Sequence, residues 1–151
     1  MSQMTDYLEN KLVDHIFRNR VFATPSTIYI GLYLSSGAPG DTTTGSAGGD
    51  AVSGTGYTRI QVGPSDTTWN ATQGGTPASA STGTGGATAN SSTITFPTPT
   101  GNWGSIASFG IFDATTAGNC LLYGTLTNAK TVNNGDPAPY FAAGALTVTF
   151  A

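Results

Sequence analysis

The sequence has few charged side chains and no long apolar run, and each scarcity excludes a class of protein. Only 9% of the 151 residues are charged, against roughly 25% in typical soluble domains. The formal net charge is -3 and only 5 residues are Lys or Arg, which argues against binding to a nucleic-acid backbone. No apolar run approaches the roughly 18 residues that a membrane span needs. We therefore expect no nucleic acid and no membrane among the partners.

Histidine and cysteine occur once each. Cys120 has no second cysteine with which to form an intrachain disulfide, and its place beside two leucines predicts a buried small hydrophobe rather than a nucleophile. His15 has no other residue at zinc-ligand spacing, and the neighbouring Asp14 points in a different direction on a helix. The 8 acidic residues show no calcium-loop spacing. We expect no catalytic residue, no metal site and no cofactor.

Small residues replace the missing charged ones. The chain has 21 glycines, while aromatic residues still make up 10%. Disorder usually combines high net charge with few aromatics, so we expect a folded chain, and its length fits one domain, 1–151. A weakly charged surface suits packing against other proteins, although an ordinary secreted β-domain would share this composition. Residues 1–10 lack the basic start and apolar stretch of a secretion signal, so we expect synthesis in a cytoplasm.

The densest apolar segment, 102–126, is predicted to form two strands joined by a turn. Alternate side chains of a strand point to opposite faces, and residues 105–114 place apolar groups on both. Residues 115–119, with Gly118 among them, suit a hairpin turn, and residues 120–126 then run back. Strands that are apolar on both faces lie in the middle of a sheet. We therefore expect the other strands to assemble around this hairpin.

One N-terminal amphipathic helix is predicted over 6–20, where Leu8, Leu12 and Ile16 recur every four residues. Such an apolar stripe needs a cover. The cover is either an edge of the chain's own sheet or the surface of a neighbouring subunit.

Strand patterns and turns occupy the rest of the chain, 27–151, without helices between the strands. This order excludes a parallel α/β fold and predicts a mainly β, single-domain antiparallel β-sandwich, jelly-roll or immunoglobulin-like, or a small barrel. The neutral segments 36–56 and 71–91 are predicted to be long loops, and the second is either a floppy surface loop or an arm that orders against a partner. The further predicted strands are 27–35, 57–62, 67–70, 93–96, 130–133 and 145–151.

Two tryptophans are candidates for contact with a partner. Trp69 and Trp103 could form a stacking platform for sugars, whereas the place of Trp103 directly before the central strand favours an aromatic at the rim of the core. Together with the helix stripe, they make up the candidate partner-contact set: Leu8, Leu12, Ile16, Trp69 and Trp103.

Several stretches, taken together, carry a family resemblance. They are YLENKLVDHIFR, STIYIGLYLS, GTGYTRIQV, KTVNNGD, FAAGALTVTF and, most specifically, WGSIASFGIFD followed by GNCLLYGTL. They resemble small virion structural proteins of tailed bacteriophages, of the capsid decoration (cement) or tail-fibre-like kind. The resemblance implies a structural role in the virion, without a catalytic motif. Its recurrent residues map onto fold positions: Trp103, Gly104, Phe109, Gly110, Asp113, Tyr123 and Gly124.

Our first hypothesis is a non-enzymatic capsid decoration protein that binds the outer shell and stabilises contacts between capsid subunits. Its partners would be the major capsid protein and other copies of itself in a homo-oligomer, because shell stabilisation uses many contacts repeated by symmetry. The alternative is a tail-associated, tail-fibre or baseplate component that could bind host surface glycans. A third hypothesis, a polysaccharide hydrolase, would need two paired carboxylates, and no such pair is visible in the sequence. All but the third place the chain in the virion.

Overall fold

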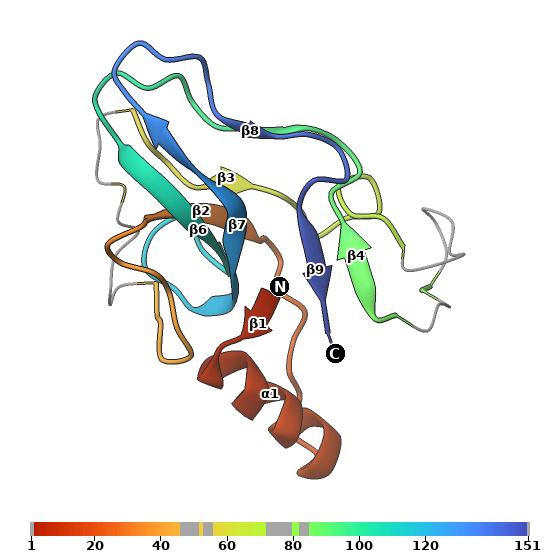
Figure 1. Ribbon diagram of the computed structural model, residues 1–151. Helices are drawn as coiled ribbons and strands as arrows, with labels where there is room; N and C mark the ends of the chain where they lie inside the picture. The colour runs from red at the N-terminus through yellow and green to blue at the C-terminus, as the bar shows by residue number, and fades with distance from the viewer. Residues whose placement is uncertain (1, 46–51, 53–55, 72–79, 82–84, 151) are drawn as a thin grey trace.

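The computed structural model describes residues 2–45, 52, 56–71, 80–81 and 85–150. Their strands form one five-stranded sheet and two two-stranded ladders, with every pairing antiparallel (Figure 1). The elements are β1 (Ser2–Met4), α1 (Asp6–Phe17), β2 (Tyr29–Leu34), β3 (Ile60–Gln61), β4 (Ala87–Ala89), β5 (Ile94–Thr95), β6 (Gly104–Phe112), β7 (Cys120–Val132), β8 (Tyr140–Phe141) and β9 (Thr147–Thr149).

The large sheet has the strand order β1-β7-β6-β2-β3, and the two ladders pair β4 with β9 and β5 with β8. A mainly β chain with one N-terminal helix is therefore confirmed for the described residues. One sheet with two short ladders does not by itself establish a jelly-roll or immunoglobulin-like sandwich, so that part of the fold stays a prediction.

The predicted central hairpin is confirmed. β6 pairs with β7 on one side and with β2 on the other, and every residue from Ser108 to Phe112 is buried. The turn between the strands is closed by Asp113, whose carboxylate accepts hydrogen bonds from the Asn119 backbone N–H and side-chain Nδ2, both at 2.7 Å. Residues 130–133 were predicted as a separate strand, but residues 130–132 are the end of β7. The pairing of β7 with β6 shifts register locally and then continues to Val132.

The two faces of the sheet bury different groups. Tyr33, Phe112 and Cys120 form a small cluster, which confirms Cys120 as a buried residue. Gly31 and Gly110 pair across β2 and β6, and the Phe112 ring lies so close that a Cβ on either glycine would stand 2.8–2.9 Å from it. The larger core gathers most other buried hydrophobic residues, among them Ile30, Leu32, Phe96, Trp103, Ile106, Phe109, Ile111, Leu122, Val132, Leu146 and Val148.

Several boundaries differ from the sequence predictions. The helix ends at Phe17 rather than at residue 20, because Asn19 adopts a left-handed conformation (φ 53°) that a helix does not continue through. The predicted loop 71–91 contains β4, whose Ala-Thr-Ala sequence carries little strand signal. Predicted strand 67–70 is reduced to a bridge between Trp69 and Asn90. The predicted strands 27–35, 57–62, 93–96 and 145–151 are present with shorter bounds, and the sequence did not predict β1 and β8. Residues 46–51, 53–55, 72–79 and 82–84 of the two predicted loops lie outside the described residues.

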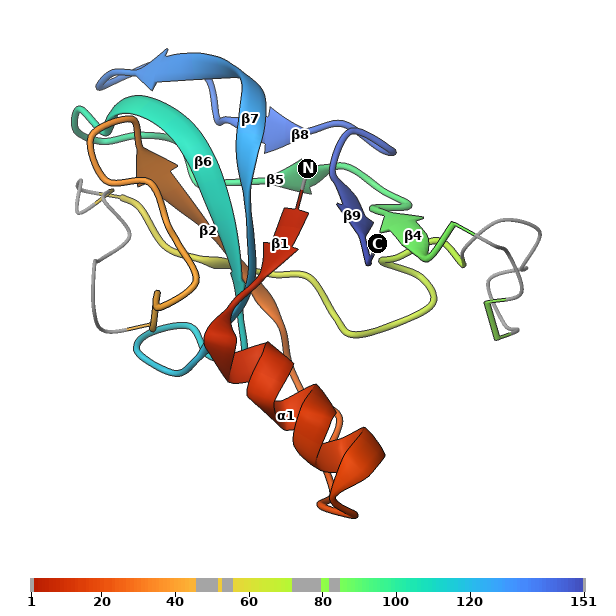
Figure 2. The ribbon, with the colours of Figure 1, turned by 60° about the horizontal axis from the view of Figure 1, so that its bottom comes forward.

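α1 packs against the sheet only with its first half and projects from the body in both ribbon views (Figures 1 and 2). Leu8 is buried and Leu12 half-buried, so the chain's own sheet edge covers this part of the predicted stripe. Thr5 precedes the helix, and its hydroxyl donates to the Cys120 carbonyl of β7 at 2.6 Å. In the described part of the chain, no helix is long and apolar enough to cross a membrane.

Candidate interaction surfaces

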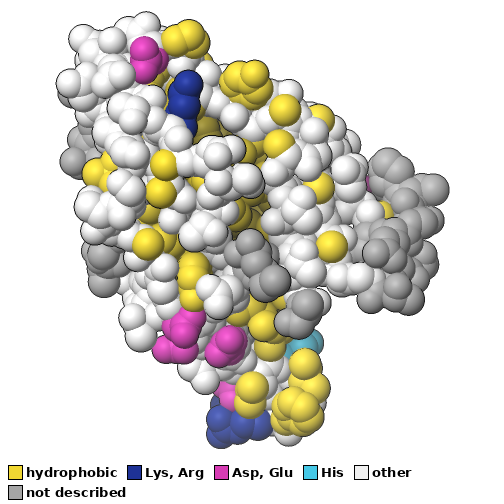
Figure 3. Space-filling view, viewed as in Figure 1, with side chains coloured by type: hydrophobic (Ala, Val, Ile, Leu, Met, Phe, Trp, Pro, Cys, Tyr) yellow, Lys and Arg dark blue, Asp and Glu magenta, His cyan; other side chains and the backbone are white. Residues whose placement is uncertain are grey.

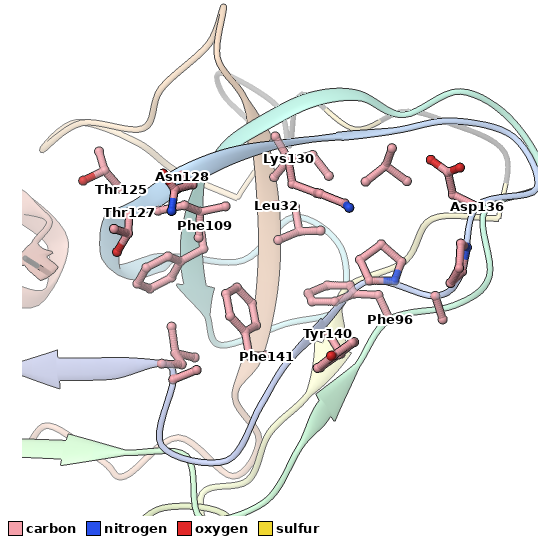
Figure 4. Close-up of a pocket in the computed structure, with 18 of the residues that line it drawn as sticks. Leu32, Phe96, Phe109, Thr125, Thr127, Asn128, Lys130, Asp136, Tyr140 and Phe141 are labelled. Atoms are coloured by element: carbon pink, nitrogen blue, oxygen red, sulfur yellow. The ribbon is translucent and has the colours of Figure 1, made fainter.

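A groove of about 690 Å³ opens between the β6–β7 hairpin and the segment 136–147. This volume is within the range of roughly 300–1,000 Å³ that is typical of ligand sites. Apolar side chains are visible in the hollow of this face (Figure 3). The floor is apolar and includes Leu32, Phe96, Phe109 and Phe141, while the rim is polar (Figure 4). Ile106 also lines the groove.

The aromatic floor is held by ring contacts. Phe141 meets both Phe96 and Phe109 edge to face, each with ring centroids 6.2 Å apart. Tyr57 stacks on Phe96 and meets Trp103 edge to face. This chain of contacts fixes the floor rigidly beneath the groove.

The rim of the groove supplies hydrogen-bonding and charged groups. Asn128 and Lys130 lie in the C-terminal half of β7, and Asp136 and Tyr140 lie in the segment 136–147 on the other side of the groove (Figure 4). The Tyr140 side chain is 66% exposed. An exposed aromatic ring beside amide, ammonium and carboxylate groups can stack on an apolar ligand face and bond to its polar edge.

The second candidate surface is the projecting end of α1. Its apolar side chains are exposed by 50% at Val13, 65% at Ile16 and 79% at Phe17, and Val21 just beyond the helix is 89% exposed. They follow the helix spacing of i, i+3 and i+4, so they form one face. Exposed apolar faces of this kind mark interaction sites more often than single exposed hydrophobes do.

The five predicted contact residues fall into different environments. Leu8 is buried in the chain's own core and Leu12 is half-buried, whereas Ile16 belongs to the exposed α1 face. Trp103 is 3% exposed, and Trp69 is half-buried with its indole Nε1 donating to the Val62 carbonyl at 2.6 Å. The structure therefore does not gather the two tryptophans into an open sugar platform, and Leu8 and Trp103 have little surface to offer. The partner role of the set stays a prediction.

His15 and Asp14, the adjacent pair on the helix, each have a partner within the chain. His15 accepts a hydrogen bond at Nδ1 from the Phe22 N–H at 3.2 Å and so holds the chain that leaves α1. Asp14 pairs with Arg18 one turn away at 2.8 Å. Among the described residues, no group of three or more His, Cys, Asp or Glu side chains is placed to hold a metal ion.

One tyrosine on the sheet has a strongly shifted pKa. The Tyr123 hydroxyl donates a hydrogen bond to the Asp41 carboxylate. This bond, followed by burial and by the negative charges of Asp41, Glu9 and Asp6, raises the pKa of Tyr123 to about 12. The neutral hydroxyl therefore fastens the loop at Asp41 to β7.

This shift predicts a loss of stability at high pH. An unfolded tyrosine ionises near pH 10, so ionisation favours the unfolded chain between there and the folded pKa of about 12. The stabilisation by Tyr123 is complete below about pH 10 and should decline as pH rises toward 12, by less than the roughly 2.7 kcal/mol of two full pKa units because solvent screens part of the interaction. Denaturant unfolding at stepped pH should show a shallower decline for Tyr123→Phe than for wild type. Equal slopes in the two proteins would contradict the prediction.

Sequence reasoning missed the groove and half of the exposed helix face. Tyr140 and Phe141 lie in a proline-containing segment that reads as a turn. The apolar pattern of 6–20 does not indicate where the sheet stops covering the helix, so the exposure of Val13 and Phe17 could not be predicted from it. An exposed face could have been suspected only from the width of the apolar stripe.

Comparison with protein families gives a match over nearly the whole chain. The model of a protein family described as "Podophage GP4 fiber I protein gp80" matches residues 3–149. No curated protein matches the chain. The family match covers the sheet, both ladders, α1 and the groove.

Proposed function

Because the chain belongs to the podophage GP4 fiber I protein gp80 family, we propose that it works as a non-enzymatic structural part of the phage tail-fibre apparatus, held in place by contacts with neighbouring proteins. The family makes the chain a fibre-related structural component of the virion. The step beyond the family is the mode of action, which is binding to protein neighbours rather than turnover of a substrate.

The observation that carries this proposal is the exposed apolar end of α1. Phe17 at the end of α1 and Val21 just beyond it are among the most exposed large hydrophobic side chains of the described residues, and the helix projects from the sheet (Figure 2). Exposure of such side chains to water is unfavourable, and burial contributes roughly 1.5–3 kcal/mol for each one. The exposed apolar end of α1 would therefore gain free energy by packing against the surface of another protein.

The family match favours the tail-fibre alternative over the capsid-decoration hypothesis. That hypothesis depended on the shortness of the chain and on its neutral loops, which are features that a short fibre-associated protein shares. The major capsid protein was expected as a partner only because of the capsid-decoration hypothesis, so the family match no longer favours it. Other copies of the chain remain candidate partners.

Labelling intact particles tests the location. Gold-labelled antibody against the chain should bind at the tail of the particle, in the small copy number of a fibre, and not across the head. Antibody raised against an unrelated major head protein provides the matched control on the same particles. Label distributed over the head in hundreds of copies would overturn the proposal.

The groove favours a second candidate function, binding of a surface glycan. Its exposed Tyr140 ring offers a stacking face, and Asn128, Lys130 and Asp136 offer partners for hydroxyl groups. On a glycan array, Tyr140→Ala should reduce binding by up to about tenfold, because ring stacking is worth roughly 0.5–1.5 kcal/mol. Trp69→Ala, remote from the groove lining, is the comparison. An array without any bound glycan would eliminate this candidate.

A further inference from the structure

One face of α1 carries a repeating pattern of exposed residues. Asp6, Glu9, Val13 and Ile16 are spaced by three, four and three residues, and all four are exposed. Residues at alternating three- and four-residue spacing share a helix face and form the seam of a helix pair. The seam is acidic at its start and apolar in its second half, and it lies on a different face of the helix from Leu8, which is buried.

The far end of α1 is basic. Lys11, Arg18 and Arg20 are three of the chain's five Lys and Arg residues, and they line one shallow hollow there together with Asp14 and Val21. The remaining two are Arg59, which is buried, and Lys130, at the groove. In a chain with so few charges, basic residues are concentrated at the tip of a single helix (Figure 3).

The base of α1 has the opposite charge. Asp6 and Glu9 occupy the first turn, and the Asp6 N–H bonds to the backbone of Asp41 at 2.9 Å. The charges of these three acids all act on the Tyr123 hydroxyl, so they lie around one point of the surface. α1 thus joins an acidic base to a basic tip through an exposed apolar seam.

We propose that α1 pairs with α1 of a second copy of this chain, antiparallel and about a two-fold axis. If Val13 packs opposite the second copy's Ile16, Glu9 lies at the end of the other helix, where Arg18 and Arg20 are. Each basic tip then meets an acidic base, and the two helix dipoles oppose one another favourably. A parallel pair would instead place tip against tip and base against base, with like charges together.

The pairing should be reversible and sensitive to salt. The seam comprises few side chains, whereas a standard interface buries about 800 Å² on each partner. Its selectivity depends on exposed charges, whose attraction is screened within roughly 8–10 Å at physiological ionic strength. Apolar contact supplies the affinity, and the charge pattern determines the antiparallel orientation.

Sedimentation velocity of the full chain, across a concentration series, tests the proposal. Wild type should show a monomer–dimer equilibrium that shifts toward monomer in 0.5 M salt, a condition set at about three times physiological ionic strength. Ile16→Ser should weaken the dimer without changing the unfolding midpoint, because the side chain is exposed. A wild-type chain that is monomeric at every concentration overturns the proposal.

Charge reversal separates the antiparallel pair from a parallel one. Glu9→Lys and Arg20→Glu should each weaken self-association by about tenfold, because each reversal converts two attractive contacts into repulsive ones. An equimolar mixture of the two variants restores both contacts and should dimerise as wild type does. Tighter self-association of Glu9→Lys, or no recovery in the mixture, would contradict the antiparallel arrangement.

Discussion

Replacement of Arg59 by leucine is expected to lower the free energy of unfolding by about 3 kcal/mol. The side chain is only 5% exposed, yet it is hydrogen-bonded to three backbone carbonyls. One guanidinium nitrogen donates to the Ala114 and Ala117 carbonyls, each at 3.0 Å, and the other donates to the Gly45 carbonyl at 3.2 Å. The guanidinium also lies 3.5 Å from the centroid of the Phe112 ring.

The cost arises because leucine fills the space but removes the donor that joins these three carbonyls, and a hydrogen bond to a charged group contributes roughly 1.5–3 kcal/mol. Lysine carries the charge as a single point and does not reproduce the planar fork, so Arg59→Lys should recover only part of the loss. Arg20→Leu, at an exposed position, is the matched control. Equilibrium urea unfolding measures all three variants. An Arg59→Leu protein within about 0.5 kcal/mol of wild type would show that the fork is not essential.

The role of Arg59 illustrates what the sequence could not predict. Within 57–62 it alternates with Ile60 and reads as a polar, outward-facing residue. Its burial depends on the turn at 114–117, which lies more than fifty residues away, and on glycines that let the Phe112 ring lie flat beside it. No local pattern contains that information, because the contacts join three separate segments.

The central hairpin, in contrast, could be predicted because its signals are local. Period-two alternation with apolar groups on both faces specifies a buried strand, and Asp113 to Asn119 supplies its own turn chemistry. Short edge strands such as β1 and β4 lack such a signal, since only their pairing with β7 and β9 makes them strands. Sequence therefore indicated the middle of the sheet better than its margins.

The two candidate surfaces were predictable to different degrees. The helix face follows a periodicity that the sequence displays, and Ile16 of the predicted apolar stripe lies on it. Which part of the stripe is covered depends on where the sheet ends, so Leu8 is buried and Phe17 is exposed. The groove gathers residues from β2, β6, β7, β8 and β9, and a site assembled from five strands has no signature in any one of them.

Replacement of Asn90 by alanine is expected to lower the free energy of unfolding by about 2–3 kcal/mol. The residue is fully buried. Its Nδ2 donates to the Ser92 and Ala142 carbonyls, both at 2.8 Å, and its Oδ1 accepts from the Leu146 N–H at 2.9 Å. One side chain thus satisfies three backbone groups and joins the end of β4 to the segment between β8 and β9.

Alanine removes all three bonds, while Asn90→Asp keeps the acceptor, loses the donors and introduces a buried charge. Both variants should therefore be destabilised, and Asn134→Ala, at an exposed turn, should not. Because Asn90 anchors one ladder, hydrogen exchange should accelerate first at Val148 and Thr149 in β9, and much less in β6 at the sheet centre. Uniform acceleration through the whole chain would instead indicate that Asn90 supports the entire fold as one cooperative unit. Unchanged stability and exchange would show that other contacts hold the C-terminal segment, since the backbone of Asn90 also bonds to Leu146 and Gly144.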